Sequence, residues 1–156
     1  MYMKLYANPA DFTWGTVLPI LDRPDHPRFF LLADTYTLRR QITISDLSHR
    51  TAVLIRQDIL SLFPRFELEI YGKPTAAVQR SCPDSPSHYT ISPLNWEVTD
   101  YSGPSSYRIT CAGTPVAACC PWEQADQSFV AWEIQDRTLL LPALGVMALI
   151  SCVIPR

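Results

Sequence analysis

The sequence predicts a mainly β protein, an antiparallel meander of hairpins in a single domain over residues 1–156. Apolar and polar residues alternate with period two through most of the chain, as in strands that are buried on one face. Gly, Pro, Asp and Ser interrupt this alternation at short intervals, which favours hairpins over a βαβ arrangement. A chain of 156 residues suits one hydrophobic core, and no linker-like segment divides it.

Three segments share one hairpin pattern: residues 41–57 with a turn at 46–50, residues 66–80 with a turn at 72–74, and residues 107–120 with a turn at 113–115. Gly72 and Gly113 supply the positive φ that the last two turns require. The apolar residues expected on one face of each hairpin are Ile42, Ile44, Ala52 and Leu54; Phe66, Leu68, Ile70, Ala76 and Val78; and Tyr107, Ile109, Cys111, Ala117 and Cys119. Segments rich in Pro, Ser or Asp are expected to be loops: residues 21–27, 82–88 and 101–106.

The C-terminal segment from Leu139 to Ile154 carries no charged residue. It is shorter than the about 20 apolar residues of a membrane-spanning helix, and Pro142 fits the first turn of a helix, where its missing N–H needs no partner. A helix over residues 142–152 is apolar on every side, so it must be buried on every side. Three arrangements are open: a helix enclosed by the sheet, a C-terminal membrane anchor, or a buried strand. We favour the enclosed helix, because a sheet closed around it leaves no strand edge unpaired.

Composition disfavours some partners. The chain is 47% hydrophobic and 18% charged, has a net charge of -2, and contains only two lysines, Lys4 and Lys73. This positive field is too weak to hold a polyanion, so no nucleic acid partner is expected. The N-terminal residues lack the charged and apolar segments of a secretory signal. We therefore expect a cytoplasmic protein without a transmembrane span.

The cysteines do not form a recognisable metal or redox motif. There are five of them, an odd number, and no pair has C-x-x-C spacing. Cys119 and Cys120 are adjacent, and neighbouring side chains of a strand point to opposite faces. We expect the cysteines to act as small buried hydrophobes.

No residue pattern predicts catalysis. Each histidine falls in an expected turn or loop and is expected to be solvated: His26, His49 and His88. Asp22 and Asp25 beside His26 are a weaker alternative, a metal site, although the prolines of that segment favour a rigid turn. Glu67 and Glu69 are expected on an exposed strand face rather than as a pair for acid–base chemistry. We therefore expect no enzymatic activity, no metal site and no cofactor.

Several segments in fixed order resemble the LURP-one-related/YxjI family of the Tubby C-terminal-like superfamily, which also includes the phospholipid scramblases. The resemblance covers nearly the whole chain, and the stretch Ile59 to Leu68 carries most of it, with a leucine-rich turn, a proline, a basic residue and an aromatic residue that opens a strand. The other segments are Phe12–Gly15, Arg28–Phe30, Gln41–Asp46, Asn95–Val98, Pro115–Ala117 with Trp122, and Leu144–Val153.

The resemblance implies a closed antiparallel barrel of about twelve strands around one central hydrophobic C-terminal α-helix, an arrangement that leaves no sheet edge exposed. The chain departs from the family pattern at three places. It has Ala33-Asp34 where a glycine is common, Cys119-Cys120 where a basic pair is common, and Ser151 near a position that is commonly acidic.

In the Tubby branch a basic patch on the barrel binds phosphoinositide head groups, and the scramblase branch acts at membranes. Arginine binds phosphate in bidentate fashion, so we take Arg39, Arg40 and Arg65 as candidate contacts for a phosphate or lipid head group, against the alternative of solvated rim residues. Four tryptophans are expected to pack in the core or at the barrel rim, with an interfacial belt as the alternative: Trp14, Trp96, Trp122 and Trp132.

Three functional hypotheses follow. The first is a non-enzymatic barrel that serves as a binding or scaffold module, with a phospholipid head group or a protein as partner, and that is peripheral at the membrane. The second is a scramblase-like membrane-active protein whose C-terminal helix inserts in lipid. The third is an enzyme whose site is assembled from loops without a sequence motif.

Overall fold

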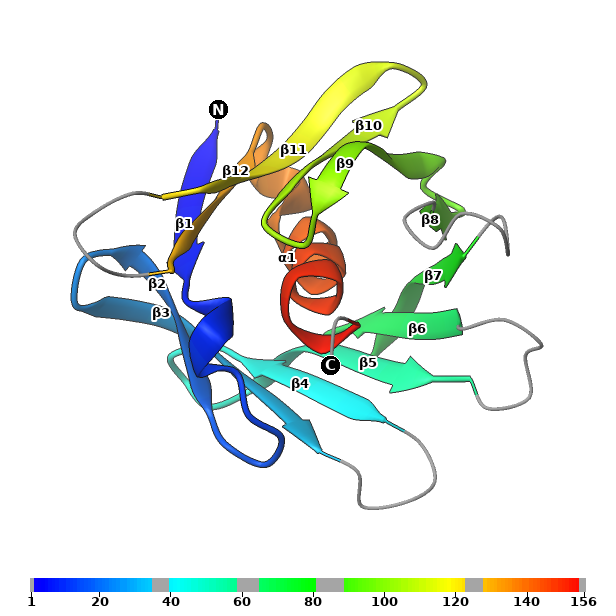
Figure 1. Ribbon diagram of the computed structural model, residues 1–156. Helices are drawn as coiled ribbons and strands as arrows, with labels where there is room; N and C mark the ends of the chain where they lie inside the picture. The colour runs from blue at the N-terminus through cyan, green and yellow to red at the C-terminus, as the bar shows by residue number, and fades with distance from the viewer. Residues whose placement is uncertain (1, 35–39, 59–64, 81–88, 123–127, 155–156) are drawn as a thin grey trace.

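The protein is a closed barrel of antiparallel strands with a helix along its axis (Figure 1). A computed structural model describes residues 2–34, 40–58, 65–80, 89–122 and 128–154. The strands are β1 Met3–Ala7, β2 Leu18–Arg23, β3 His26–Asp34, β4 Gln41–Ser45, β5 Thr51–Gln57, β6 Arg65–Ile70, β7 Lys73–Arg80, β8 Tyr89–Ser92, β9 Trp96–Gly103, β10 Ser106–Cys111, β11 Thr114–Pro121 and β12 Val130–Ile134. The helical segments are η1 Pro9–Asp11, η2 Arg137–Leu139, α1 Leu140–Ala148 and η3 Leu149–Val153.

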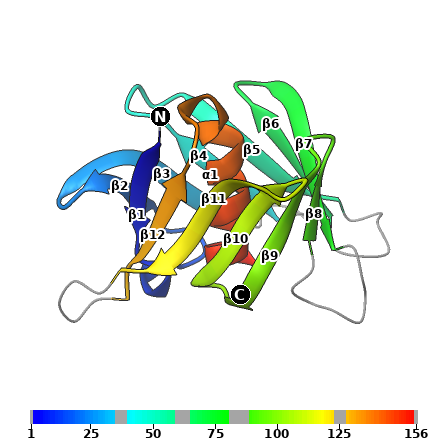
Figure 2. The same cartoon turned by 90° about the horizontal axis from the view of Figure 1, so that it is seen from above.

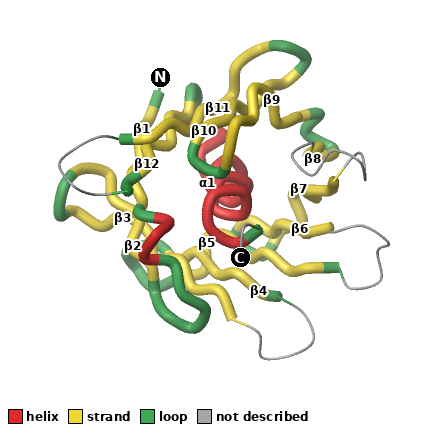
Figure 3. The backbone as a smooth tube through the Cα atoms, in the orientation of Figure 1, coloured by secondary structure: helices red, strands yellow, loops and turns green. Residues whose placement is uncertain are grey.

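The strands follow one another around the barrel as a meander. Each strand pairs with the next in the chain, and β12 pairs with β1 from Met3↔Ile134 to Ala7↔Val130. Figure 3 shows the strands as a ring around the helix. This strand order confirms the predicted fold class, a closed antiparallel barrel of about twelve strands around a C-terminal helix. Closure pairs the first strand with the last, so that the sheet formed by the described strands has no free edge.

The C-terminal helix lies inside the barrel. The chain leaves β12, passes through η2 and continues through α1 into η3, a π-helical turn in which the Ile154 N–H donates to the Leu149 carbonyl at 2.8 Å. Figure 2 shows the helix running along the barrel axis, with its start at the end of the barrel where β1 begins. Residues 143–153 are all buried, as an all-apolar helix requires. None of the helices in the described ranges has the length and apolar character to cross a membrane.

Gly145 allows α1 to approach the barrel wall closely. A Cβ atom at this position would lie 2.9 Å from Leu68 Cδ2 and 3.0 Å from Val53 Cγ1, closer than carbon atoms pack. Val53 lies on β5 and Leu68 on β6, and both are buried. The small residue at position 145 therefore sets the distance between the helix and this side of the sheet.

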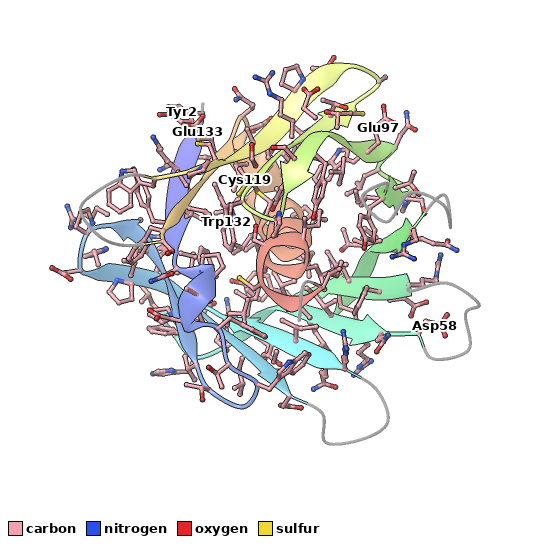
Figure 4. All side chains as sticks on the ribbon, in the orientation of Figure 1. Tyr2, Asp58, Glu97, Cys119, Trp132 and Glu133 are labelled. Carbon is pink, nitrogen blue, oxygen red and sulfur yellow. The ribbon has the colours of Figure 1, made fainter. Side chains whose placement is uncertain are left out.

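The buried Ser151 hydroxyl connects the end of the helix to strands β10, β11 and β12. Ser151 Oγ accepts a hydrogen bond from Trp132 Nε1 at 3.3 Å, and it lies 2.8 Å from the Tyr107 hydroxyl oxygen and 3.7 Å from Cys119 Sγ. Cys119 and Trp132 come from β11 and β12, which border the helix (Figure 4). Burial raises the pKa of the Cys119 thiol to about 11, so this thiol stays protonated and unreactive at neutral pH.

The predicted hairpins are present. The turn at residues 46–50 is confirmed, and the other two turns are shorter than the sequence indicated. Gly72 and Gly113 have the expected positive φ, 82° and 85°, but each is the second residue of a two-residue turn, so that β7 and β11 begin immediately after the glycine. Residues 21–27 and 101–106 were expected as loops and are largely strand, because the ladders continue up to two-residue turns at 24–25 and 104–105. The predicted loop at 82–88 lies outside the described residues.

The predicted inner face of β5 is wrong in part. A bulge after Ile44 lets both Ala52 and Val53 lie buried, and from there Val53 and Ile55 face inward while Leu54 is only half-buried. One extra residue thus reverses the alternation expected from period two. Of the adjacent cysteines, Cys119 is buried and Cys120 is exposed, so they lie on opposite faces as expected, but Cys120 is not a buried hydrophobe.

Candidate anion-binding site

A basic hollow lies at the end of the barrel where α1 begins, which we call the proximal end. The hollow has a volume of about 530 Å³, and four of its seven lining residues are cationic while one is a carboxylate. The lining residues are Tyr2, Met3, Lys4, Asp22, Arg23, Arg28 and Arg137. This concentration of positive charge contrasts with the net charge of -2 of the whole chain.

Barrel closure brings these residues together from three separate parts of the sequence. Arg23 ends β2, Arg28 lies on β3 of the same hairpin, and Arg137 opens η2, which joins β12 to α1. The Asp136 side chain caps η2 by accepting the Thr138 N–H at 3.0 Å, which fixes the backbone that carries Arg137. β1 lies between β2 and β12 in the barrel, so Lys4 completes the group.

The arginines of the hollow keep their charge available. Among the described residues, Arg23, Arg28 and Arg137 form no ion pair with a carboxylate. The carboxylate of the lining, Asp22, lies 2.6 Å from His26 Nδ1, so one of its oxygens is occupied by that ring. Within the described ranges the hollow therefore presents three guanidinium groups that are not ion-paired with a carboxylate.

Lys4 adds a fourth, partly compensated cation. Its ammonium group lies 3.3 Å from Glu133 Oε1 on the paired strand β12. Partial burial works against the charged form, but the hydrogen bond to Glu133 and the attraction of that carboxylate outweigh it and raise the pKa of Lys4 above its ordinary value.

A second hollow of about 510 Å³ continues from the first and shares Arg28 and Arg137. It is also lined by the tips of the β4–β5 and β6–β7 hairpins and by the first residues of α1. The first turn of α1 contains no acidic side chain, and Asp136 caps the η2 turn that precedes it. The two hollows form one continuous surface on which an anion meets positive charge.

Two of the arginines predicted from the sequence, Arg40 and Arg65, lie elsewhere and engage other groups. Arg40 lies just before β4, with its guanidinium carbon 5.4 Å from the centre of the Trp14 ring. Arg65 donates from Nη1 to Gln79 Oε1 at 3.0 Å, and its Nε lies 3.9 Å from Glu67 Oε1. Arg39 lies outside the described residues. The phosphate contact by Arg39, Arg40 and Arg65 stays a prediction.

Arg65 borders a groove of about 470 Å³ on the outer face of β5, β6 and β7. Two arginines and two glutamates line this groove, and they face each other: Arg65 Nε lies 3.9 Å from Glu67, and Arg56 Nη1 lies 3.8 Å from Glu69 Oε2. Because the charges compensate one another, an anion in this groove would have to displace a carboxylate. The basic hollow is therefore the better anion site.

Apart from the contact between Asp22 and His26, the described residues with other possible chemistry do not form a cluster. His49 lies in the β4–β5 turn with a φ of 63°, as the loop prediction requires, and His88 lies outside the described residues. Asp22 contacts His26, but within the described ranges no three His, Cys, Asp or Glu side chains are grouped so as to hold a metal ion. Glu67 is exposed, in agreement with the prediction of a solvated strand face.

The tryptophans pack as expected. Trp96 and Trp132 are buried in the core. Trp14 and Trp122 are half-buried, and their rings contact Phe12 at 5.5 Å and Tyr6 at 4.3 Å between ring centres.

Sequence reasoning missed Arg23, Arg28 and Arg137 because nothing local marks them. They are separated by five and by more than one hundred residues, and each stands alone among uncharged or acidic neighbours. Arg39 and Arg40, in contrast, are adjacent in the sequence, and this pair predicts a phosphate contact. The position of Arg137 could have been inferred from barrel closure. If β12 pairs with β1, and β1 pairs with β2, the residues that follow β12 must lie near the β2–β3 hairpin.

Comparison with known proteins supports a relationship in sequence and in fold. No sequence profile of a known family matches the chain. The uncharacterized protein YxjI of Bacillus subtilis (strain 168) is 30% identical over 96 residues, a match that covers 62% of this chain and 59% of that protein. The X-ray structure of a protein from Arabidopsis thaliana superimposes with a TM-score of 0.66 at 13% identity and covers 99% of this chain and 92% of that one. The chain is thus similar to YxjI over part of its length, and it shares its fold with the Arabidopsis protein.

Proposed function

We propose that the protein is a non-enzymatic barrel module of the LURP-one-related/YxjI type that binds the phosphate of a phospholipid head group, peripherally at the membrane surface. The similarity to YxjI and the shared barrel support the type of module. The observation that carries the ligand class is the basic hollow, with three arginines that have no carboxylate partner among the described residues.

The chemistry of the hollow suits a phosphate ester. A guanidinium donates two parallel hydrogen bonds to two oxygens of one phosphate, and such charge-assisted pairs are stronger than neutral hydrogen bonds. A volume of about 530 Å³ accommodates a head group and leaves the hollow open to solvent at the rim of the barrel. Among the described residues that line the hollow there is no Ser, Cys or His, so this lining suits binding rather than turnover.

Sedimentation with phosphatidylcholine vesicles, with and without phosphatidylserine, tests the proposal. Binding is expected only with the anionic lipid and should weaken as salt concentration rises, because exposed charges are screened. The double variant Arg28→Ala/Arg137→Ala should lose about 2 kcal/mol, at about 1 kcal/mol for each arginine near an anionic surface, which is about a thirtyfold weaker affinity.

The double variant Arg39→Ala/Arg40→Ala is the matched control, because it removes the same charge at the pair predicted from the sequence. It should bind as the wild type does. If it loses binding while Arg28→Ala/Arg137→Ala does not, the phosphate site lies at the sequence-predicted arginines. If the wild type binds neither vesicles nor soluble glycerol phosphate, the proposed function is wrong.

A further inference from the structure

Apolar side chains gather at the proximal end, beside the cations. Five large hydrophobic side chains of the described residues are exposed, and three of them line the two hollows: Tyr2 is 56% exposed, Leu47 55% and Tyr71 46%. The other two, Val17 and Tyr101, line neither hollow. Exposed apolar side chains that are clustered on one surface, rather than scattered, mark an interaction site.

Hydrogen bonds hold Leu47 and Tyr71 in this exposed position. The Tyr71 hydroxyl donates to Asp46 Oδ2 at 2.9 Å, and Asp46 Oδ1 accepts the backbone N–H groups of Ser48 and Arg50 at 2.9 and 3.0 Å. The tips of the β4–β5 and β6–β7 hairpins are thereby tied together. Because these tips are ordered before any partner arrives, docking them costs little conformational entropy.

The side-chain chemistry of this end fits the surface of an anionic bilayer. Tyrosine places its ring in the interfacial layer and its hydroxyl in water, and leucine gains from leaving water. The Arg50 guanidinium lies over the Tyr71 ring at 5.0 Å, and Arg28 and Arg137 lie in the hollow next to Leu47. The carboxylates that face the same hollows, Asp22 and Asp46, are engaged within the protein, by the His26 ring and by the hydrogen bonds described above.

We infer that the barrel seats on an anionic lipid surface by its proximal end, with Leu47 and Tyr71 in the interfacial layer and lipid phosphates in the basic hollow. The inference rests on the proposed function and adds the side chains that enter the lipid and the orientation of the molecule. The start of α1 faces the membrane, and the end of η3 faces away from it, because the helix lies along the barrel axis (Figure 2).

The test compares Leu47→Ser with Val17→Ser, a matched loss of one exposed apolar side chain away from the hollows. Leu47→Ser should bind vesicles that contain phosphatidylserine about tenfold more weakly than the wild type, because leucine no longer leaves water on docking. It should bind soluble glycerol phosphate as the wild type does, since the hollow keeps its arginines. Val17→Ser should change neither affinity, and Leu47→Trp should bind vesicles at least as tightly as the wild type.

The inference and the proposed function fail in different ways. Unchanged vesicle binding by Leu47→Ser, together with lost binding by Arg28→Ala/Arg137→Ala, overturns the seating and leaves the phosphate site in place. Binding of glycerol phosphate without vesicle binding by the wild type overturns the seating and the membrane location in the proposed function, and leaves only the phosphate site. If Val17→Ser weakens vesicle binding and Leu47→Ser does not, the opposite end of the barrel meets the lipid.

Discussion

Ser151 shows how one polar residue can specify the packing of an otherwise apolar helix. It is the one buried polar residue of the described part of the chain, and Trp132 Nε1 and the Tyr107 hydroxyl converge on its oxygen from the barrel wall. The Tyr107 hydroxyl donates its hydrogen to the Met147 carbonyl at 3.2 Å, just before the π-helical turn, and can therefore accept the hydrogen of the Ser151 hydroxyl. These contacts fix the rotation of the helix, which a uniform apolar surface alone would leave weakly specified.

Removal of the Ser151 hydroxyl should destabilise the protein measurably. In Ser151→Ala the buried Trp132 N–H loses its acceptor, which should lower the free energy of unfolding by about 1–3 kcal/mol. Urea denaturation measures the change, with Ser48→Ala in the exposed β4–β5 turn as the control. Equal stability of the two variants would show that the hydroxyl does not hold the helix in place.

Asp46 gives the proximal end a dependence on pH. Desolvation works against its charge, but hydrogen bonds from the Arg50 N–H, the Tyr71 hydroxyl and the Ser48 N–H outweigh it and hold the pKa of Asp46 below its ordinary value. A carboxyl group whose pKa is lowered by folding stabilises the protein above its unfolded pKa, and this contribution disappears as the pH falls through the lowered pKa.

Asp46→Asn should therefore be less stable than the wild type at neutral pH, and the difference should shrink in acid. Urea denaturation across a pH series checks this, and Asp100→Asn, at an exposed carboxylate, serves as the control that changes little. A difference that stays constant down to the most acidic pH would contradict the role given to these hydrogen bonds.

At the scale of elements, the sequence indicated more about strands than about their ends. Alternation identified the hairpins at 41–57, 66–80 and 107–120, because burial on one face of a strand imposes period two. It did not identify the bulge that buries both Ala52 and Val53, since a single extra residue leaves no mark in composition. The ladders that extend β2 and β3 over residues 21–27 were also hidden, because Pro24 and Asp25 are typical of a loop as well as of a tight turn.

The enclosed helix makes a sharp prediction at Gly145. Gly145→Asp should prevent folding, because the side chain would meet Leu68 and Val53 and would bury a charge without a partner. Circular dichroism and gel filtration measure folding, and Val17→Asp, at an exposed position, is the control that should fold normally. A folded Gly145→Asp protein would mean that the helix can leave the barrel.

At the scale of the whole molecule, the candidate site is a product of closure. No segment of the sequence contains it, because Arg23 and Arg28 come from one hairpin and Arg137 from the connection between the last strand and the helix. The sequence predicted the closed barrel and the buried helix, yet it could not place Arg137, since this requires knowing which strands meet when the sheet closes. The proposed function at this end of the barrel therefore depends on topology more than on any motif.

The most direct test of the basic hollow is an NMR titration of the 15N-labelled protein with glycerol phosphate, observed at the arginine Nε–H signals. The signals of Arg23, Arg28 and Arg137 should shift together and saturate with one affinity, because a phosphate held between them changes the hydrogen bonding of each guanidinium. The signals of Arg56 and Arg65, which face carboxylates, should stay in place. Saturable shifts at Arg56 and Arg65, with none at Arg28 and Arg137, would contradict the assignment of the site.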